Sequence, residues 1–136
     1  FWSYPDHGHM DGYTMAGVVN TFPVGVTVNF NLIKSQSGGF TIWPGTHIRA
    51  TEYFKTHSLL NRSKAYGESG DLPEPVEISG LPGTVCFWNH LMMHSAGNNC
   101  RKEIRMAFVS RLNRVDIEDV MFETPDDMWE YWEGIN

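Results

Sequence analysis

The sequence predicts a mainly β domain, in which a closed or sandwiched antiparallel sheet is accompanied by one or two short helices. Short apolar segments are separated by turns that contain Gly and Pro, and residues 25–32 alternate apolar and polar side chains with a period of two. The sequence contains neither an internal repeat nor a low-complexity stretch. A length of 136 residues suits one compact domain, so we expect residues 1–136 to form a single unit.

The segment 25–32 is the clearest strand. Its apolar side chains share one face, and the opposite face carries three polar ones, Thr27, Asn29 and Asn31. A polar face of this kind fits a solvated sheet surface or the lining of a polar cavity inside a barrel. The remainder of the chain favours the cavity.

The other elements follow from turn residues and spacing. Residues 38–43 read as a turn into a strand that Pro44 and Gly45 close, and a helix is expected over 48–60. A long polar loop over 61–75 is typical of a lid, a substrate loop or a disordered segment. Further strands are expected at 76–79, 84–88 and 104–112, and a C-terminal helix is expected to begin near Thr124.

Composition excludes several classes of function. The formal net charge is −6 and no basic stripe is present, which argues against a nucleic-acid partner. No apolar run is long enough to span a bilayer. The two cysteines, Cys86 and Cys100, match no metal-binding spacing and suit a reducing compartment, so we expect a cytoplasmic protein. A start at Phe1 is compatible with a processed, trimmed or partial product.

Three residues suggest a metal site. His9 and Asp11 are two apart, so on a strand their side chains would point toward a common centre. His94 completes a set of two histidines and one carboxylate, which leaves three coordination positions open and is diagnostic of non-haem Fe(II) oxygenases.

Two further segments have a familiar pattern. Residues 39–47 read Gly-Phe-Thr-Ile-Trp-Pro-Gly-Thr-His, and residues 83–98 read Gly-Thr-Val-Cys-Phe-Trp-Asn-His-Leu-Met-Met-His-Ser-Ala-Gly-Asn. Together with the His-x-Asp pair, they make the chain resemble the phytanoyl-CoA dioxygenase family of Fe(II)- and 2-oxoglutarate-dependent oxygenases. The resemblance extends from about Tyr4 to Arg111.

The resemblance implies a double-stranded β-helix, a jelly-roll or cupin-like barrel. It implies that His9, Asp11 and His94 hold Fe(II), and that Arg105 binds the distal carboxylate of 2-oxoglutarate. With O2 as the other cosubstrate, such an enzyme would hydroxylate a small molecule and release succinate and CO2. Asp11 favours hydroxylation over halogenation, since halogenating relatives carry a small residue at this position.

The chain departs from the family pattern at one cosubstrate position. A hydroxyl residue often stands two after the distal His, where this chain has Ala96. Ser95 and Thr27 are the candidate replacements, and Asn29 shares the face of Thr27. Family members are also longer, with N-terminal elements that help to close the pocket. The predicted substrate pocket comprises three residues, His7, Tyr13 and Asn31.

Several alternatives stay open. His7 competes with His9 as the ligand, but we place His7 at the pocket rim because it stands four residues from Asp11. His90 reads as a residue behind the ligands or on the surface, and His47 and His57 read as structural or exposed. Two rival functions are a cupin-type metal protein and a non-catalytic ligand-binding barrel. The protein is expected to be a monomer or a homodimer.

Overall fold

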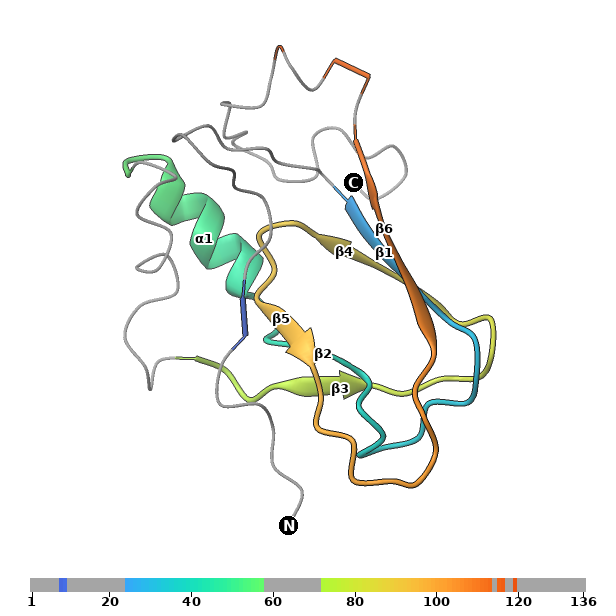
Figure 1. Cartoon of the computed structure of the whole chain (residues 1–136). Coiled ribbons are helices and arrows are strands. Elements are labelled where there is room, and N and C mark those ends of the chain that lie inside the picture. The colour runs from blue at the N-terminus through green and yellow to red at the C-terminus, as the bar shows by residue number, and fades with distance from the viewer. Residues whose placement is uncertain (1–7, 10–23, 58–71, 114, 117–118, 120–136) are drawn as a thin grey trace.

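Two antiparallel sheets that face each other form the core of the fold (Figure 1). The computed structural model describes residues 8–9, 24–57, 72–113, 115–116 and 119. The first sheet has the order β4-β1-β6, built from β1 (Val24–Asn29), β4 (Val85–Asn89) and β6 (Ala107–Leu112). The second has the order β3-β2-β5, built from β2 (Phe40–Ile42), β3 (Val76–Ile78) and β5 (His94–Ala96). This architecture confirms the expected mainly β, jelly-roll class.

The polar face of β1 is turned toward the second sheet. The register pairs Gly25 with Trp88 and Thr27 with Cys86, so these residues share one face of the first sheet. Trp88 meets Phe40 of the second sheet with ring centroids 5.4 Å apart, which identifies this face as the inner one. Thr27 is 2% exposed and Asn29 is 6% exposed. The polar face is therefore buried between the sheets and is not a solvated surface.

The outer face of the first sheet is apolar and partly exposed: Val26 is 9% exposed, but three phenylalanines on this face are much more open. Phe30, Phe87 and Phe108, which follow β1 or lie on β4 and β6, are each more than half exposed. A half-buried antiparallel sheet ordinarily turns its apolar residues inward and its polar ones outward. In β1 the polar Thr27 and Asn29 point inward instead, whereas Val26 on the opposite face is also buried.

A glycine makes room for the central tryptophan. A Cβ atom placed on Gly25 would lie 2.1 Å from Cε2 of Trp88, closer than any real contact. Trp88 therefore lies flat across β1 because the facing position has no side chain. The ring is 5% exposed and fills the space between the two sheets.

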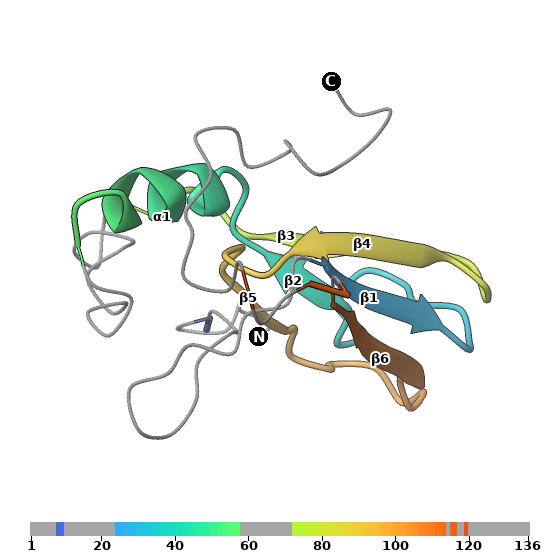
Figure 2. The same ribbon diagram turned by 90° about the horizontal axis from the view of Figure 1, so that it is seen from above.

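The helix α1 (Thr46–Phe54) lies beside one end of the sheets, as Figure 2 shows from above. It begins after Gly45, whose φ of 79° favours glycine, and its buried residues Thr46, Ala50 and Phe54 recur every four positions. Phe54 and Ala50 pack on Trp43 and Met93, which precede α1 and β5. In the described part of the chain, no helix is long and apolar enough to cross a membrane.

Several boundaries differ from the expected ones. The helix expected over 48–60 ends at Phe54, because the amides of Thr56 and His57 both donate to the Tyr53 carbonyl and close the last turn. The strand expected over 104–112 begins only at Ala107, and β1 ends at Asn29 instead of continuing to residue 32. The predicted C-terminal helix lies outside the described residues.

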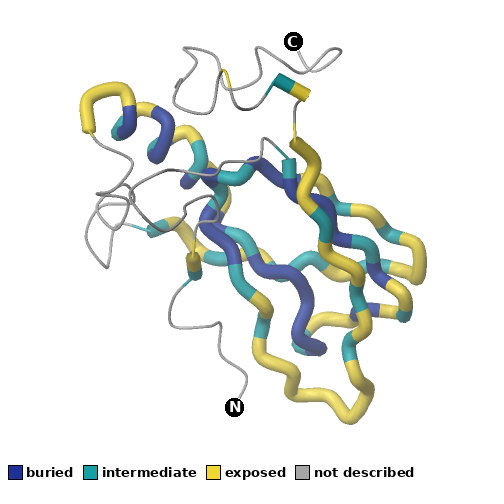
Figure 3. The backbone as a smooth tube through the Cα atoms, turned by 45° about the horizontal axis from the view of Figure 1, so that its top comes forward, coloured by how far each residue is buried: buried dark blue, intermediate teal, exposed yellow. Residues whose placement is uncertain are grey.

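The buried backbone runs through the facing strands, the inner side of α1 and residues 37–39 before β2, whereas the loop between β5 and β6 is mostly exposed (Figure 3). The loop between β1 and β2 is joined to the loop between β5 and β6 by several hydrogen bonds. The amide of Cys100 donates to the Gln36 carbonyl at 3.0 Å, and Nε of Arg101 donates to the Ser35 carbonyl at 3.1 Å. These loops therefore tie the two sheets together at that end of the barrel.

Burial of His47 on α1 predicts a dependence of stability on pH. Desolvation lowers the pKa of this imidazole below its ordinary value of 6.5, so the folded state takes up a proton less readily than the unfolded state. The stability that neutral His47 contributes is complete above the pKa of the unfolded state. It is lost as the pH falls from that pKa to the lower pKa of the folded state. Urea midpoints at pH 7.5 and pH 5.5 should differ less in His47→Gln than in the parent protein. The exposed His57 provides the control, and an equal reduction in His57→Gln would contradict this assignment.

Candidate metal and cosubstrate site

Contacts from the start of α1 fix the backbone immediately before His94. Oγ1 of Thr46 donates to the Trp43 carbonyl at 2.7 Å and accepts the amide N–H of Met93 at 3.0 Å. The amide of Trp43 in turn donates to the Met93 carbonyl at 3.0 Å. The Pro-Gly-Thr turn recognised in the sequence thus has a physical role: its threonine anchors the entry to β5, where His94 stands.

His9 and His94 form a hydrogen-bonded antiparallel pair. The His9 amide donates to the His94 carbonyl at 2.8 Å, and the His94 amide donates to the His9 carbonyl at 2.9 Å. Side chains of directly opposed residues project from the same face. Their ring centroids accordingly lie only 4.4 Å apart, so two predicted ligands that are 85 positions apart in sequence come together.

A glycine permits this close approach. A Cβ atom on Gly8 would lie 2.6 Å from the ring of Trp43 and 2.9 Å from the His94 carbonyl oxygen. Any larger residue at this position would push His9 away from β5. The importance of Gly8 was not apparent from the sequence, where it stood only as the residue between two histidines.

The His94 ring is oriented by its surroundings. Its Nδ1 atom lies 2.8 Å from the Met92 carbonyl oxygen, which directs Nε2 away from the backbone and leaves it available for a metal. Trp88 and Phe40 flank the ring, with centroid separations of 4.2 and 5.4 Å. His94 is 5% exposed whereas His9 is open to solvent, so the pair presents one sheltered and one accessible imidazole.

The two imidazoles fit a shared metal ion, since both are paired on one face and His94 is fixed for ligation through Nε2. The predicted carboxylate ligand Asp11 lies outside the described residues, as do His7 and Tyr13. Within the residues that are described, no group of three His, Cys, Asp or Glu side chains forms a metal cluster. The described part of the site is therefore a pair of histidines.

Arg105 precedes β6 and continues its inner-face pattern. It is half-buried, and its Nε atom is buried without a hydrogen-bond partner in the part of the chain that the structure describes. Burial lowers the pKa of the guanidinium from its ordinary value, and the negative charge of Glu77 opposes that effect. An arginine remains protonated in such a setting. A buried cation with an unused donor is suited to an anionic ligand.

Of the other predicted cosubstrate residues, two lie on the inner face of the first sheet and the third points away from His94. Thr27 and Asn29 are buried on the inner face of β1, and the Thr27 hydroxyl has no hydrogen-bond partner among the described residues. Ser95 pairs with Thr41 and so lies on the opposite face of β5 from His94. Its hydroxyl donates to the carbonyl of Ala96. Of the two candidate replacements for the family hydroxyl, Thr27 is on the inner face.

Asn31, the described member of the predicted substrate pocket, makes two hydrogen bonds through its side-chain amide. Both ends of its amide bind the backbone on either side of Arg105, at Ile104 and Met106. Asn31 therefore contacts the segment that carries the predicted cosubstrate arginine.

Glu77 on β3 contributes to the electrostatic surroundings of Arg105, and the sequence did not indicate this. Its two carboxylate oxygens accept the amides of Gln36 and Gly39 at 2.6 and 2.7 Å. These bonds fix a negative charge near Arg105 and also hold the turn in which Gln36 has a φ of 63°. No local pattern marked Glu77, because its partners lie about forty residues earlier in the chain.

The other histidines that the structure describes lie on or after α1 and in the turn before β5. His57 is exposed at the end of α1, where its ring stacks on Tyr53 at 4.1 Å, as expected for a surface residue. His47 lies on α1 and is half-buried, and His90 lies in the turn between β4 and β5. Trp43 and Trp88 are core residues, as the sequence suggested.

Comparisons with known proteins show a similarity of fold but no relative in sequence. No protein-family model matches the chain, and no curated protein matches it in sequence. The chain is similar in structure to the non-heme alpha-ketoglutarate-dependent carbocyclase SnoK from nogalamycin biosynthesis, with a TM-score of 0.55 and 18% sequence identity. The match covers 88% of this chain and 50% of that enzyme, so this chain spans about half of its length.

Proposed function

We propose that this domain is the catalytic core of an Fe(II)- and 2-oxoglutarate-dependent oxygenase that hydroxylates a small molecule. The observation that carries the proposal is the paired imidazoles of His9 and His94, 4.4 Å apart on one face. The half-buried Arg105 on the facing sheet and the fold shared with a non-heme alpha-ketoglutarate-dependent enzyme add independent support. The motif resemblance supplies the proposed family, that of phytanoyl-CoA dioxygenase.

The proposed ligands of the iron are His9, His94 and Asp11. Bound Fe(II) would support hydroxylation of a C–H bond by O2, with 2-oxoglutarate as the two-electron reductant that leaves as succinate and CO2. His94 holds Nε2 toward the ion because Nδ1 is committed to the Met92 carbonyl. With a carboxylate at Asp11, we propose hydroxylation in preference to halogenation, as the motif implied.

Arg105 is the proposed partner of the distal carboxylate of 2-oxoglutarate. Its guanidinium can offer two parallel N–H donors to a carboxylate, and partial burial strengthens such a contact by excluding water. Thr27 stands on the same inner surface with an unused hydroxyl. Trp88 and Phe40 form an apolar wall beside His94, which limits water near the site.

Anaerobic visible absorbance tests the proposal directly. Adding Fe(II) and then 2-oxoglutarate to the protein should produce a charge-transfer band that neither addition produces alone. In Arg105→Ala we expect the concentration of 2-oxoglutarate for half-maximal absorbance to rise by about tenfold or more, since a charge-assisted pair contributes roughly 1.5–3 kcal/mol. Lys102→Ala removes the same charge from an exposed position three residues earlier and should leave the titration unchanged.

The absence of the band in protein that has bound iron would overturn the proposal. Such a result would favour a cupin-type metal protein that does not use 2-oxoglutarate. Protein that binds neither iron nor 2-oxoglutarate would instead favour the non-catalytic barrel. An equal shift in Lys102→Ala and Arg105→Ala would remove Arg105 from its proposed role.

A further inference from the structure

Asn31 lies just beyond the end of β1 and makes two hydrogen bonds with the backbone around Arg105. Its Nδ2 donates to the Ile104 carbonyl at 2.8 Å, and its Oδ1 accepts the Met106 amide at 2.9 Å. A carbonyl can only accept and a backbone N–H can only donate, so one orientation of the side-chain amide satisfies both bonds. The assignment of nitrogen and oxygen in Asn31 therefore follows from its partners.

These two bonds continue the β1–β6 ladder after the backbone of β1 has left it. The register pairs Val24 with Leu112 and Asn29 with Ala107, and the Phe30 amide still donates to the Met106 carbonyl at 2.9 Å. In a continued antiparallel ladder, Met106 would donate to the Phe30 carbonyl and Ile104 would accept from Leu32. The side-chain amide of Asn31 takes both of those places, directly opposite Arg105.

The pairing keeps residues 104–106 in strand-like alternation. Ile104 is 78% exposed and Met106 is 53% exposed, whereas Arg105 between them is half-buried. Successive side chains of a strand point to opposite faces, so fixing the backbone on both sides of Arg105 determines the face from which its side chain emerges. Without Asn31, the amide of Met106 and the carbonyl of Ile104 would lose these partners, and the segment could rotate.

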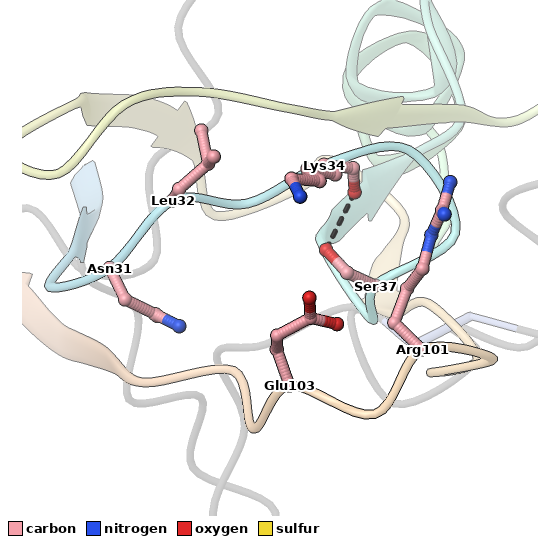
Figure 4. A pocket seen from close by; sticks show the side chains of 6 residues that line it. All are labelled: Asn31, Leu32, Lys34, Ser37, Arg101 and Glu103. Atoms are coloured by element: carbon pink, nitrogen blue, oxygen red, sulfur yellow. Dashed lines mark hydrogen bonds between the residues drawn. The ribbon is translucent and has the colours of Figure 1, made fainter.

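The surroundings of Asn31 are open. Its side chain borders a cavity of about 140 Å³ that Lys34, Ser37, Arg101 and Glu103 also line (Figure 4). Water can reach this side of the amide, so the two bonds belong to a solvated loop and not to the packed core. Removing them is therefore expected to loosen residues 104–106 locally and to leave the facing sheets intact.

We propose that Asn31 is a positioning residue for the cosubstrate: by bridging Ile104 and Met106, its amide holds the guanidinium of Arg105 toward the barrel interior. This inference rests on the proposed function, in which Arg105 binds the distal carboxylate of 2-oxoglutarate. Asn31 itself does not touch the cosubstrate. Its contribution is to the fraction of molecules in which Arg105 is already correctly placed.

The chain offers a closely matched control in Asn99. The amide of Asn99 also bridges backbone groups of the same loop, donating to the Glu103 carbonyl at 2.9 Å and accepting the Arg101 amide at 2.9 Å. Its two bonds end before Arg105 and do not bracket it. Asn31→Ala and Asn99→Ala therefore delete the same group and the same number of hydrogen bonds from neighbouring positions.

The test measures iron and 2-oxoglutarate binding separately, together with amide hydrogen exchange in the metal-free protein. In Asn31→Ala we expect faster exchange of the Met106 amide and a rise of about three- to tenfold in the dissociation constant for 2-oxoglutarate, from loss of up to two hydrogen bonds. Affinity for Fe(II) should be unchanged. Asn99→Ala should leave both affinities within about twofold of the parent, since exposed polar changes away from a site have small effects.

Combining the substitution with Arg105→Ala separates positioning from general structural damage. If Asn31 acts through Arg105, Asn31→Ala should add nothing to the loss already caused by Arg105→Ala. Additive losses, equal losses in Asn31→Ala and Asn99→Ala, or unchanged 2-oxoglutarate affinity in Asn31→Ala would each overturn the inference. A parent protein that binds iron without 2-oxoglutarate would refute the proposed function instead, so the two failures are distinguishable.

Discussion

Replacement of His94 by alanine is expected to abolish both iron binding and turnover of 2-oxoglutarate. His94 is the buried member of the imidazole pair, and its Nδ1 contact with Met92 leaves Nε2 as the metal-binding atom. Substitutions of residues that only orient a ligand typically weaken metal affinity by about 10–100-fold. Removing the ligand itself should exceed that range, leaving turnover at the background of free iron. Iron titration and succinate formation measure the two effects.

Two further variants make this result interpretable. His94→Gln retains more of the side chain that packs on Trp88 and Phe40, and it should lose iron as completely as His94→Ala if ligation is the cause. His57→Ala removes an exposed imidazole from the end of α1 and should retain full iron binding. Tight iron binding in folded His94→Ala would show that the metal is held elsewhere.

Replacement of Trp88 by alanine is expected to produce a large loss of stability. The ring is 5% exposed, lies across Gly25 and contacts Phe40 and His94, so its removal opens a cavity between the two sheets. Truncation of a buried aromatic residue to alanine usually costs about 3–5 kcal/mol. Because small domains are stable by about 5–15 kcal/mol, this loss should be plain in a shifted urea midpoint.

The neighbouring aromatic residue of β4 supplies the comparison. Phe87 adjoins Trp88 in sequence but points to the outer face, where it is 61% exposed. Phe87→Ala should change the free energy of unfolding by at most about 1 kcal/mol, since it removes little buried area. Similar losses in Phe87→Ala and Trp88→Ala would mean that the inner and outer faces of β4 have been assigned the wrong way round.

The sequence predicted the features of this fold that depend on short-range patterns. Alternation over residues 25–32 located β1, and the Gly and Pro turns located β2, β3 and β4 within a few residues. The spacing of the His-x-Asp pair and the distal histidine identified His9 and His94 as partners, and the structure brings their rings together. These patterns are local or belong to a motif, so they can be recognised without knowledge of the three-dimensional structure.

Features that depend on contacts between distant segments could not be predicted in the same way. The sequence marked Asn31 as a polar residue on an alternating strand and as a candidate for the substrate pocket, whereas its contacts with residues 104–106 could not be predicted. Glu77 has no local signal for its bonds to Gln36 and Gly39. The start of β6 was placed too early, because the alternation of side chains continues through 104–106 although a side chain, and not a strand backbone, supplies the hydrogen-bond partner there.

Because His9 and His94 are paired through their backbones, a metal ion bound by both imidazoles would also stabilise the contact between two distant parts of the chain. His9 and His94 would bind the ion through their imidazoles. The same two residues join distant parts of the chain through their backbone amides and carbonyls. An ion that needs both imidazoles would therefore bind only when His9 and His94 are paired, so ion binding and formation of this pair would be thermodynamically linked. At a free concentration one hundred times its dissociation constant, such an ion would stabilise the paired form by about 2.7 kcal/mol. A metal bound by both imidazoles would therefore stabilise the fold in addition to any part it takes in a reaction.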